Sequence, residues 1–260
     1  MRSRTKRDRW RENQDMERVH EPDLAGVAAG ATYLRGEWCE QVFAQDAPLT
    51  LELGCGQGMF AAELARRFPS TNVVGVDLKG HRFWRGAKAV HVGGLLNAAF
   101  LRARIQWLDH FFGPGEVGEV WLTFSDPQNG DKRGTKRLTS PHYLRLYQSM
   151  LREEGVVHVK TDSPEFFENT LRDGPLAEMV VEDSCDDVHG AEPGRFDPVL
   201  TDLLAFKTAY EQRWIDEGRS VHYVRLRRQA AVDAEQLARA KRMLQGPPGA
   251  ARPHFTRPAR

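Results

Sequence analysis

Apolar and polar positions along the chain form two repeating kinds of segment. Short, almost continuous apolar runs at 49–54, 72–77, 98–105, 119–126 and 155–162 predict buried strands. Between them, apolar residues recur at helical spacing and predict helices at 59–68, 81–90, 107–112, 140–151 and 163–173. Strands that alternate with helices of this length imply a parallel sheet with helices on both faces.

The two ends of the chain depart from this alternation. Residues 25–43 predict a helix with breaks, and strands at 178–184 and 220–227 follow one another across a longer acidic insertion, which predicts an antiparallel edge. The sequence therefore predicts an α/β fold with a doubly wound, mostly parallel sheet, an antiparallel edge and basic terminal tails. Its expected parts are a mobile basic arm (1–23), one α/β domain (24–228), and a C-terminal helix at 233–244 with a Pro-rich basic tail (229–260).

A glycine-rich loop connects the first predicted strand to the helix that follows it. The stretch ELGCGQG contains Glu52, Gly54, Gly56 and Gly58. Glycines let the backbone turn tightly and let a ligand approach without meeting a Cβ atom. Asp77 ends the next strand, beside this loop, at the edge of an open α/β sheet where ligands bind. Its carboxylate could accept hydrogen bonds from both hydroxyls of a ribose.

These features suit a nucleoside cofactor, either a nicotinamide dinucleotide or S-adenosylmethionine. The loop spacing is G-x-G-x-G, which differs from the G-x-G-x-x-G spacing that sets a pyrophosphate on a helix N-terminus. Glu52 precedes the loop, where its negative charge would repel a pyrophosphate but hold a cationic ligand. Both observations favour S-adenosylmethionine. Cys55, inside the loop, is expected to fill space, because no base lies near it in the sequence.

Composition narrows the class of protein. With 260 residues, 40% of them hydrophobic and 28% charged, the chain can bury a sizeable core, and it has no apolar run long enough to span a bilayer. The basic amino terminus has no apolar segment after it, so we expect no secretory signal. Three scattered cysteines, and histidines without ligand spacing, predict neither disulfides nor a metal site. We expect a cytoplasmic protein.

The net charge of +1 hides separate charged blocks. Positive residues gather in 2–11, in 132–145 and after 225, whereas 165–202 is acidic, so a basic surface could meet a polyanion. The stretch VWLTFSDPQNGDKRGTKRLTSP begins as a strand, ends that strand with Asp126 at the same edge as the glycine loop, and then becomes basic. Trp121 and Phe124, within the strand, are expected in the core.

With these motifs the chain resembles the bacterial tRNA guanine-N7 methyltransferase family, over about residues 15–228. LELGCGQG resembles the first motif of that family, and NVVGVD resembles the second. WLTFSDPQ, followed by DKR and KRLTSP, resembles its Phe-Pro-Asp-Pro core and basic loop. HVKTD, which ends at Asp162, and KTAYEQRWIDEGRSVHYVRLR resemble its late segments.

The resemblance implies a Rossmann-like class I methyltransferase fold and transfer of a methyl group from S-adenosylmethionine to N7 of a guanosine in the tRNA variable loop. It implies that Asp126 is catalytic. The implied cofactor-binding residues are Glu52, Gly54, Gly56, Asp77 and Asp126. The implied substrate-binding residues are Lys132, Lys136 and Arg137, on the tRNA backbone, and Asp162, Thr208, Tyr210 and Glu211, on the guanosine. The expected partner is tRNA, bound by a monomer or a homodimer.

The chemistry of guanine N7 agrees with this set of residues. N7 carries a free lone pair on the major-groove edge of the base, so no general base is needed to release its electrons. Positive charge passes from the sulfonium to the purine during transfer, and a fixed carboxylate nearby keeps a partner as the charge moves. A site with carboxylates and without a catalytic His or Cys suits such a reaction.

The sequence departs from the family pattern in the loop after Asp126. Family members commonly carry Pro at Ser125, Trp at Gln128 and Lys at Gly130, and the loss of that Lys removes a cationic contact. Two alternatives remain open. One is a methyltransferase that acts on another RNA or on a small molecule, and the other is a non-catalytic homologue that binds tRNA. An NAD-dependent dehydrogenase is disfavoured by the glycine spacing and by Glu52.

Overall fold

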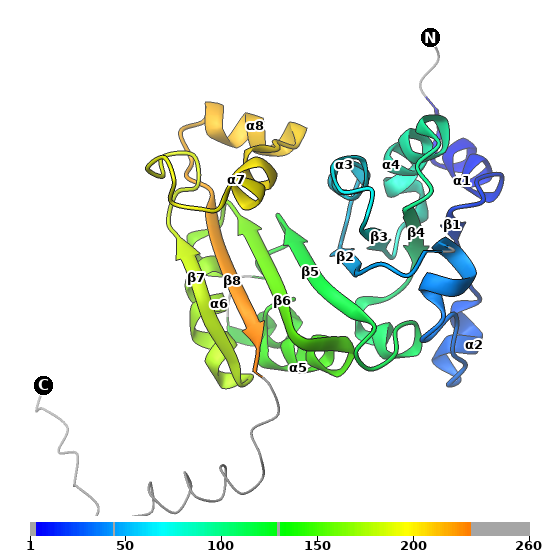
Figure 1. The fold of residues 1–260 in the computed structure, drawn as a ribbon, viewed down its shortest axis with the longest axis horizontal. Helices are drawn as coiled ribbons and strands as arrows, with labels where there is room; N and C mark the ends of the chain where they lie inside the picture. The colour runs from blue at the N-terminus through cyan, green and yellow to red at the C-terminus, as the bar shows by residue number, and fades with distance from the viewer. Residues whose placement is uncertain (1–3, 44, 129–130, 230–260) are drawn as a thin grey trace, which may run out of the picture. The chain divides into compact units, whose positions relative to one another are not determined.

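A single sheet forms the centre of the structure. The computed structural model describes residues 4–43, 45–128 and 131–229. In this part of the chain eight strands pair in the order β1-β4-β3-β2-β5-β6-β8-β7 (Figure 1). Strands β1 to β6 run parallel to their neighbours, and β8 and β7 add an antiparallel edge beside β6. The strands are β1 (Val19–His20), β2 (Leu49–Leu53), β3 (Asn72–Asp77), β4 (Ala98–Arg102), β5 (Val117–Thr123), β6 (Leu151–Thr161), β7 (Met179–Cys185) and β8 (His222–Arg228).

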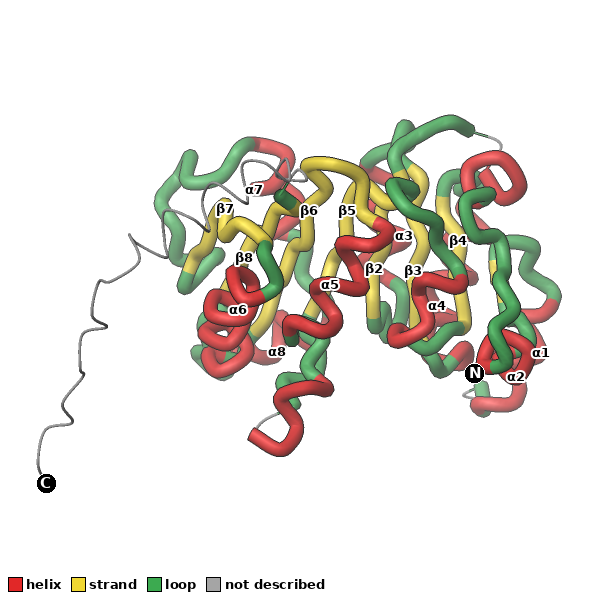
Figure 2. The backbone as a smooth tube through the Cα atoms, turned by 90° about the horizontal axis from the view of Figure 1, so that it is seen from below, coloured by secondary structure: helices red, strands yellow, loops and turns green. Residues whose placement is uncertain are grey.

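Helices cover both faces of this sheet, so the predicted α/β fold with an antiparallel edge is confirmed. One hydrophobic core joins the strands to α5 and α6, and a second core joins them to α3, α4 and α7. Figure 2 shows α5 and α6 lying across β6 and β8. The α-helices are α1 (Lys6–Gln14), α2 (Leu24–Ala28), α3 (Met59–Arg67), α4 (Gly80–Gly93), α5 (Pro141–Met150), α6 (Pro164–Leu176), α7 (Pro198–Ala205) and α8 (Ala209–Asp216). Shorter helical turns are η1 (Cys39–Phe43), η2 (Ile105–His110) and η3 (Asp131–Lys136).

Alternating side chains of β2 build the core and also present a functional group. Leu49, Leu51 and Leu53 are buried in the core that includes α5 and α6. Successive side chains of a strand point to opposite faces of the sheet. Glu52 therefore points toward α3, where its carboxylate accepts a hydrogen bond from Ala61 N at 2.9 Å.

The amino-terminal segment differs from the mobile arm expected for residues 1–23, because it contains α1 and β1. Trp84 Nε1 of α4 donates a hydrogen bond to Glu12 of α1 at 2.9 Å. Asn13 Nδ2 donates another to Gly80 O at 2.9 Å, and β1 pairs with β4. Met16 is also buried in the core that includes α3 and α4, so both polar and apolar contacts attach this segment.

Two boundaries near the predicted site differ from the expected ones. β5 ends at Thr123, because Phe124 adopts a left-handed backbone conformation with φ of 51°. Asp126 therefore lies on the loop after the strand and not at its end. The segment between β7 and β8, expected to be an acidic insertion, contains α7 and α8.

The described residues up to Arg228 form one compact unit. The predicted helix at 233–244 and the Pro-rich tail lie outside the described residues. Within the described ranges, no helix is both long enough and apolar enough to cross a membrane.

Candidate active site at the carboxyl edge of the sheet

A cavity of about 1190 Å³ lies at the carboxyl edge of the parallel strands, and we call it the main cavity. It is lined by the glycine loop after β2, by α3 and α4, by the end of β5, and by the connection between α7 and α8. Figure 1 shows α3 and α4 on one side of this edge and α7 and α8 on the other. Small-molecule sites usually enclose ~300–1,000 Å³, so the main cavity has room for a nucleoside cofactor and part of a substrate.

The glycine loop has the open backbone that the sequence predicts. Gly54 and Gly56 have φ values of 69° and 53°, in the region that favours glycine. A Cβ atom added at Gly54 would meet no atom within 4 Å, so the loop leaves open space where it lines the cavity. At Gly86 of α4, by contrast, an added Cβ would lie 2.2 Å from Gly58 O. The loop therefore rests directly on α4.

Glu52 lines the main cavity with both carboxylate oxygens held by the protein. The residue is only 2% exposed. Oε2 accepts a hydrogen bond from Ala61 N at 2.9 Å, and Oε1 accepts one from Thr123 Oγ1 at 2.8 Å. Burial raises the pKa of Glu52 to about 7, although both hydrogen bonds act in the opposite direction. A cationic group in the cavity would therefore stabilise the ionised form of a buried acid.

Asp77 ends β3 as predicted, and its carboxylate supports the glycine loop. Oδ2 accepts a hydrogen bond from Gly56 N at 3.1 Å, and Oδ1 accepts one from Lys79 N at 2.9 Å. Asp77 is buried and is not among the residues that line the main cavity. Contact with a ribose would use the second lone pair of one of these oxygens.

Asp126 does not line the main cavity. Its side chain is exposed on the loop after β5, and Oδ1 accepts a hydrogen bond from Gln128 N at 3.0 Å. Phe124 does line the cavity, and its ring centroid lies 5.2 Å from that of Trp214 on α8. The prediction of Phe124 as a core residue is therefore wrong, because the strand ends before it, whereas Trp121 is buried as predicted.

The basic loop that was predicted to contact tRNA divides into exposed and buried parts. Lys136 is exposed at the end of η3. Arg137 is only 6% exposed, and its Nη2 lies 3.3 Å from Oδ2 of the buried Asp173 on α6. A guanidinium enclosed in this ion pair cannot reach an RNA backbone without breaking the pair, so the structure gives Arg137 a different role from the predicted one. Gly130 and the side chain of Lys132 lie outside the described residues.

The late segment brings Thr208 to the main cavity and buries Glu211. Thr208 lines the cavity, and its hydroxyl accepts a hydrogen bond from Glu211 N at 3.2 Å, which caps α8. Glu211 is 0% exposed and offers no free carboxylate to a guanosine. Asp162 Oδ2 lies 3.2 Å from Arg219 Nη1 in an ion pair. The side chain of Tyr210 lies outside the part of the chain that the structure describes.

Lys160 of β6 is a residue of the site that the sequence reasoning missed. Its Nζ is buried and lies 2.6 Å from Glu211 Oε1. The same atom donates hydrogen bonds to Leu204 O at 2.7 Å and to Phe206 O at 3.1 Å. Burial lowers the pKa of Lys160, and the Glu211 carboxylate opposes this shift. Lys160 thus fastens the end of α7 and the start of α8, which form one wall of the main cavity.

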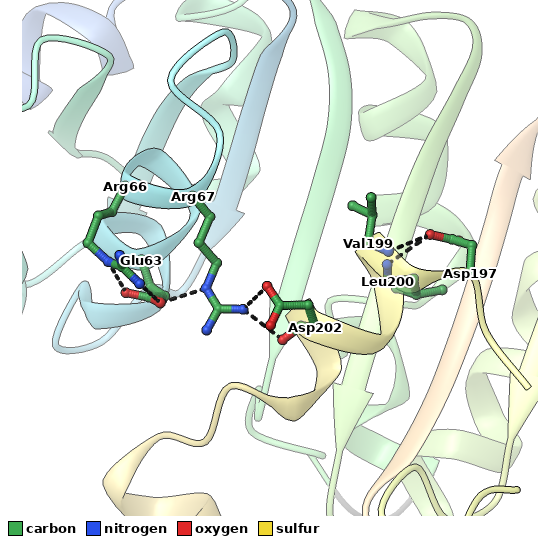
Figure 3. A network of polar contacts seen from close by, with 7 residues as sticks. All are labelled: Glu63, Arg66, Arg67, Asp197, Val199, Leu200 and Asp202. Carbon is green, nitrogen blue, oxygen red and sulfur yellow. Dashed lines mark hydrogen bonds and ion pairs between the residues drawn. The ribbon is translucent and has the colours of Figure 1, made fainter. Parts of the chain in front are cut away.

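A second polar contact fastens the same wall to α3 (Figure 3). Arg67, at the end of α3, donates a hydrogen bond from Nε to Glu63 at 2.6 Å and one from Nη1 to Asp202 O of α7 at 2.9 Å. It also forms an ion pair with the Asp202 carboxylate. Asp197 caps the start of α7 by accepting hydrogen bonds from two N–H groups of its first turn. The wall is therefore held from α3 as well as from β6.

The main cavity fits the cofactor that the sequence predicts. The open backbone at Gly54 admits a nucleoside, and Glu52 supplies a buried acid for a cationic sulfonium or ammonium group. Burial raises the pKa of the Cys55 thiol well above its usual range, so Cys55 stays neutral and fills space. Within the described ranges, no three His, Cys, Asp or Glu side chains are grouped so as to hold a metal ion.

Comparison with known proteins first defines the class of this protein. The structure is similar to that of the 16S rRNA methyltransferase KamB, with a TM-score of 0.55 and 19% identity, over 75% of this chain and 94% of that chain. At this identity the likeness shows the fold alone. The sequence model of the family described as "Putative methyltransferase" matches residues 46–224. The chain therefore has a class I methyltransferase fold and belongs to a methyltransferase family.

Relatives with assigned names then define the particular family. The chain is 40% identical to the tRNA (guanine-N(7)-)-methyltransferase of Bacteroides thetaiotaomicron, over 75% of this chain and 74% of the relative. It is 36% identical to the protein of the same name from Christiangramia forsetii, over 87% of this chain and 99% of the relative. The chain belongs to the tRNA (guanine-N(7)-)-methyltransferase family, and the resemblance seen in its motifs is confirmed.

Proposed function

We propose that this protein transfers a methyl group from S-adenosylmethionine to N7 of a guanosine in tRNA. The observation that carries the proposal is the main cavity, where the glycine loop and Glu52 lie beside the end of β5 in a chain of this family. The relatives from Bacteroides and Christiangramia bear the name of this activity. The variable loop as target and the cytoplasm as place of action belong to the same proposal.

S-adenosylmethionine, when bound, supplies an electrophilic methyl group, and the protein holds and orients it. Gly54 and Gly56 give the loop room for the nucleoside. Glu52 provides the acidic partner of the cationic end, and Asp77 holds the loop while keeping a lone pair for a ribose hydroxyl. These four residues together account for recognition of the donor.

The acceptor nitrogen carries no proton, so the reaction needs positioning and charge stabilisation more than a general base. The cavity agrees with this requirement for Cys55, because burial raises the pKa of that thiol well above its usual range and so disfavours the reactive thiolate. Phe124 and Trp214 offer aromatic faces to a purine at the cavity wall. Asp126, exposed on the adjoining loop, is the proposed catalytic carboxylate beside the purine as its charge rises.

The proposed contacts with tRNA come from the loop after β5 and from the late segment. Lys132 and Lys136 would hold phosphates, which fixes register without reading sequence. Asp162 and Thr208 are proposed to contact the guanosine. Glu211 acts on Thr208 through the cap of α8 and so supports the contact instead of making it.

A methyl-transfer assay tests the proposal. Purified full-length protein is incubated with radiolabelled S-adenosylmethionine and one of three acceptors: unmodified tRNA, a ribosomal RNA fragment, or free guanosine. We expect label in tRNA alone. Label only in another acceptor would instead support a different RNA or a small molecule as substrate. Retention of tRNA by the protein without any label would show a non-catalytic homologue.

A further inference from the structure

A second hollow lies between α1 and the turn that leads from β3 into α4, and we call it the basic groove. Its volume is about 400 Å³. Lys6 and His81 line both the basic groove and the main cavity, so the two are neighbours. Figure 1 shows α1 beside α4 at this end of the sheet. The lining residues are Lys6, Arg7, Trp10, Leu78, Lys79, Gly80, His81 and Arg102.

Polar contacts fix α1 in the position that forms the basic groove. Its start is capped by Thr5 and Asp8, whose side chains exchange hydrogen bonds with each other's backbone N–H groups. Asn13, fully buried, donates to Gly80 O from the other end of the helix. Glu12 pairs with Arg4 and with Lys88, and none of these three residues lines the groove. The groove is thus a built feature of the fold.

The charged side chains that line the basic groove are cationic. No Asp or Glu is among the described residues that line it. Within the described ranges, the four side chains of Lys6, Arg7, Lys79 and Arg102 form no ion pair with a carboxylate. After burial, the main causes that lower the pKa of His81 are the charges of nearby cations, Lys6 first. Such a concentration of positive charge favours an anion over a neutral ligand.

An aromatic side chain accompanies these charges. Trp10 is 45% exposed and Leu78 is 38% exposed, so an aromatic and an aliphatic side chain are both accessible at the groove. A cationic groove with an exposed aromatic ring is the combination by which proteins bind single-stranded nucleic acid, with phosphates on the cations and a base stacked on the ring. A free phosphate would use the cations but not Trp10.

We propose that the basic groove binds a nucleotide of the RNA substrate, with its phosphate among Lys6, Arg7 and Lys79 and its base against Trp10. The proposal rests on the proposed function, since RNA must reach the main cavity for a neighbouring nucleotide to occupy the groove. The groove would hold the RNA beside the target guanosine and contribute affinity without taking part in the chemistry.

A pair of matched variants tests this assignment in full-length protein with an unmodified tRNA. Arg7→Gln/Lys79→Gln removes two charges that line the groove but not the main cavity. Arg11→Gln/Arg152→Gln removes two exposed charges from outside both hollows, Arg152 lying at the opposite end of β6. Each lost contact with a single-stranded phosphate should reduce the slope of log affinity against log salt by about 0.7. The two substitutions should together reduce the slope by about 1.4, which corresponds to about 25-fold weaker tRNA binding at about 0.1 M salt. For the control variant we expect little change in tRNA binding.

Trp10→Leu tests the stacking part separately. The loss of one base stack should weaken tRNA binding by at least about fivefold at every salt concentration. For the groove variant and for Trp10→Leu we expect a higher KM for tRNA, with kcat and the affinity for S-adenosylmethionine unchanged, and for the control variant we expect the wild-type KM. Equal salt slopes and equal affinities for the groove and control variants would overturn the inference while leaving the proposed function intact. A wild-type protein that binds tRNA without methylating it would refute the proposed function alone, and one that binds no tRNA would overturn both.

Discussion

The buried ion pair between Lys160 and Glu211 offers a sharp test of how the cavity wall is held. Lys160→Met keeps most of the side-chain volume but removes the ammonium that lies 2.6 Å from Glu211 Oε1. It also removes the two hydrogen bonds to the end of α7. Because Glu211 is 0% exposed, its charge would lose its main partner without gaining water.

The expected loss of stability is large. Removing one partner from a buried ion pair usually costs about 3–5 kcal/mol of unfolding free energy, because an uncompensated charge remains in the interior. Stabilities of natural domains are about 5–15 kcal/mol, so Lys160→Met should be close to the limit of stable folding. The double variant Lys160→Met/Glu211→Gln removes both charges of the pair, so its unfolding free energy should decrease less than that of Lys160→Met alone.

Urea unfolding of the full-length wild type, of Lys160→Met, of Glu211→Gln and of the double variant measures the coupling between the two residues. We expect Lys160→Met to lower the unfolding free energy by at least about 3 kcal/mol, and the double variant to recover part of that loss. If Lys160→Met costs less than about 1 kcal/mol, or if the two substitutions are additive, then the pair does not hold the wall in the way that its geometry indicates.

Three further predictions concern the donor site and the reaction. The folded protein keeps a proton on Glu52 up to about pH 7, whereas the unfolded chain releases it near the ordinary pKa of 4.5. The stability of the cofactor-free protein should therefore decrease as the pH rises from 4.5 to about 7. Glu52→Gln should remove about 3 kcal/mol of that pH dependence in denaturation curves, and an unchanged pH profile would contradict the raised pKa. Gly86→Ala places a Cβ 2.2 Å from Gly58 O and should displace the glycine loop. Calorimetry should then show at least about tenfold weaker binding of S-adenosylmethionine, with tRNA binding retained. An unaltered cofactor affinity would show that the loop tolerates the shift. Asp126→Asn removes an exposed charge and should lower kcat for methyl transfer by at least about tenfold without changing tRNA or cofactor affinity, and full activity would exclude Asp126 from the chemistry.

The sheet was predictable because its signals are local. β2 and β3 are continuous apolar runs, and the Ser-Pro pairs before α5 and α6 mark helix starts, with Ser163 accepting a hydrogen bond from Phe166 N. The glycine loop and Asp77 also follow from the sequence, because their positions relative to the strands determine where they lie. Local pattern was therefore enough for the parallel core and the donor side of the cavity.

The acceptor side depends on contacts between residues far apart in the chain. Arg137 looks like any other residue of a basic loop, and only its pairing with Asp173 in the fold shows that it is buried. The same holds for Lys160 with Glu211. A local signal was available for α8, since Thr208 and Glu211 have the spacing of a capping box. The capping-box spacing predicts the start of α8, but it does not predict the burial of Glu211.

The most direct measurement is nucleoside mass spectrometry of tRNA after incubation with the wild-type protein and S-adenosylmethionine, with fragment mapping of the modified position. The proposed function predicts 7-methylguanosine at one position of the tRNA, in the variable loop. The account would be contradicted if the tRNA gains no methyl group, or if it gains one on an atom other than guanine N7.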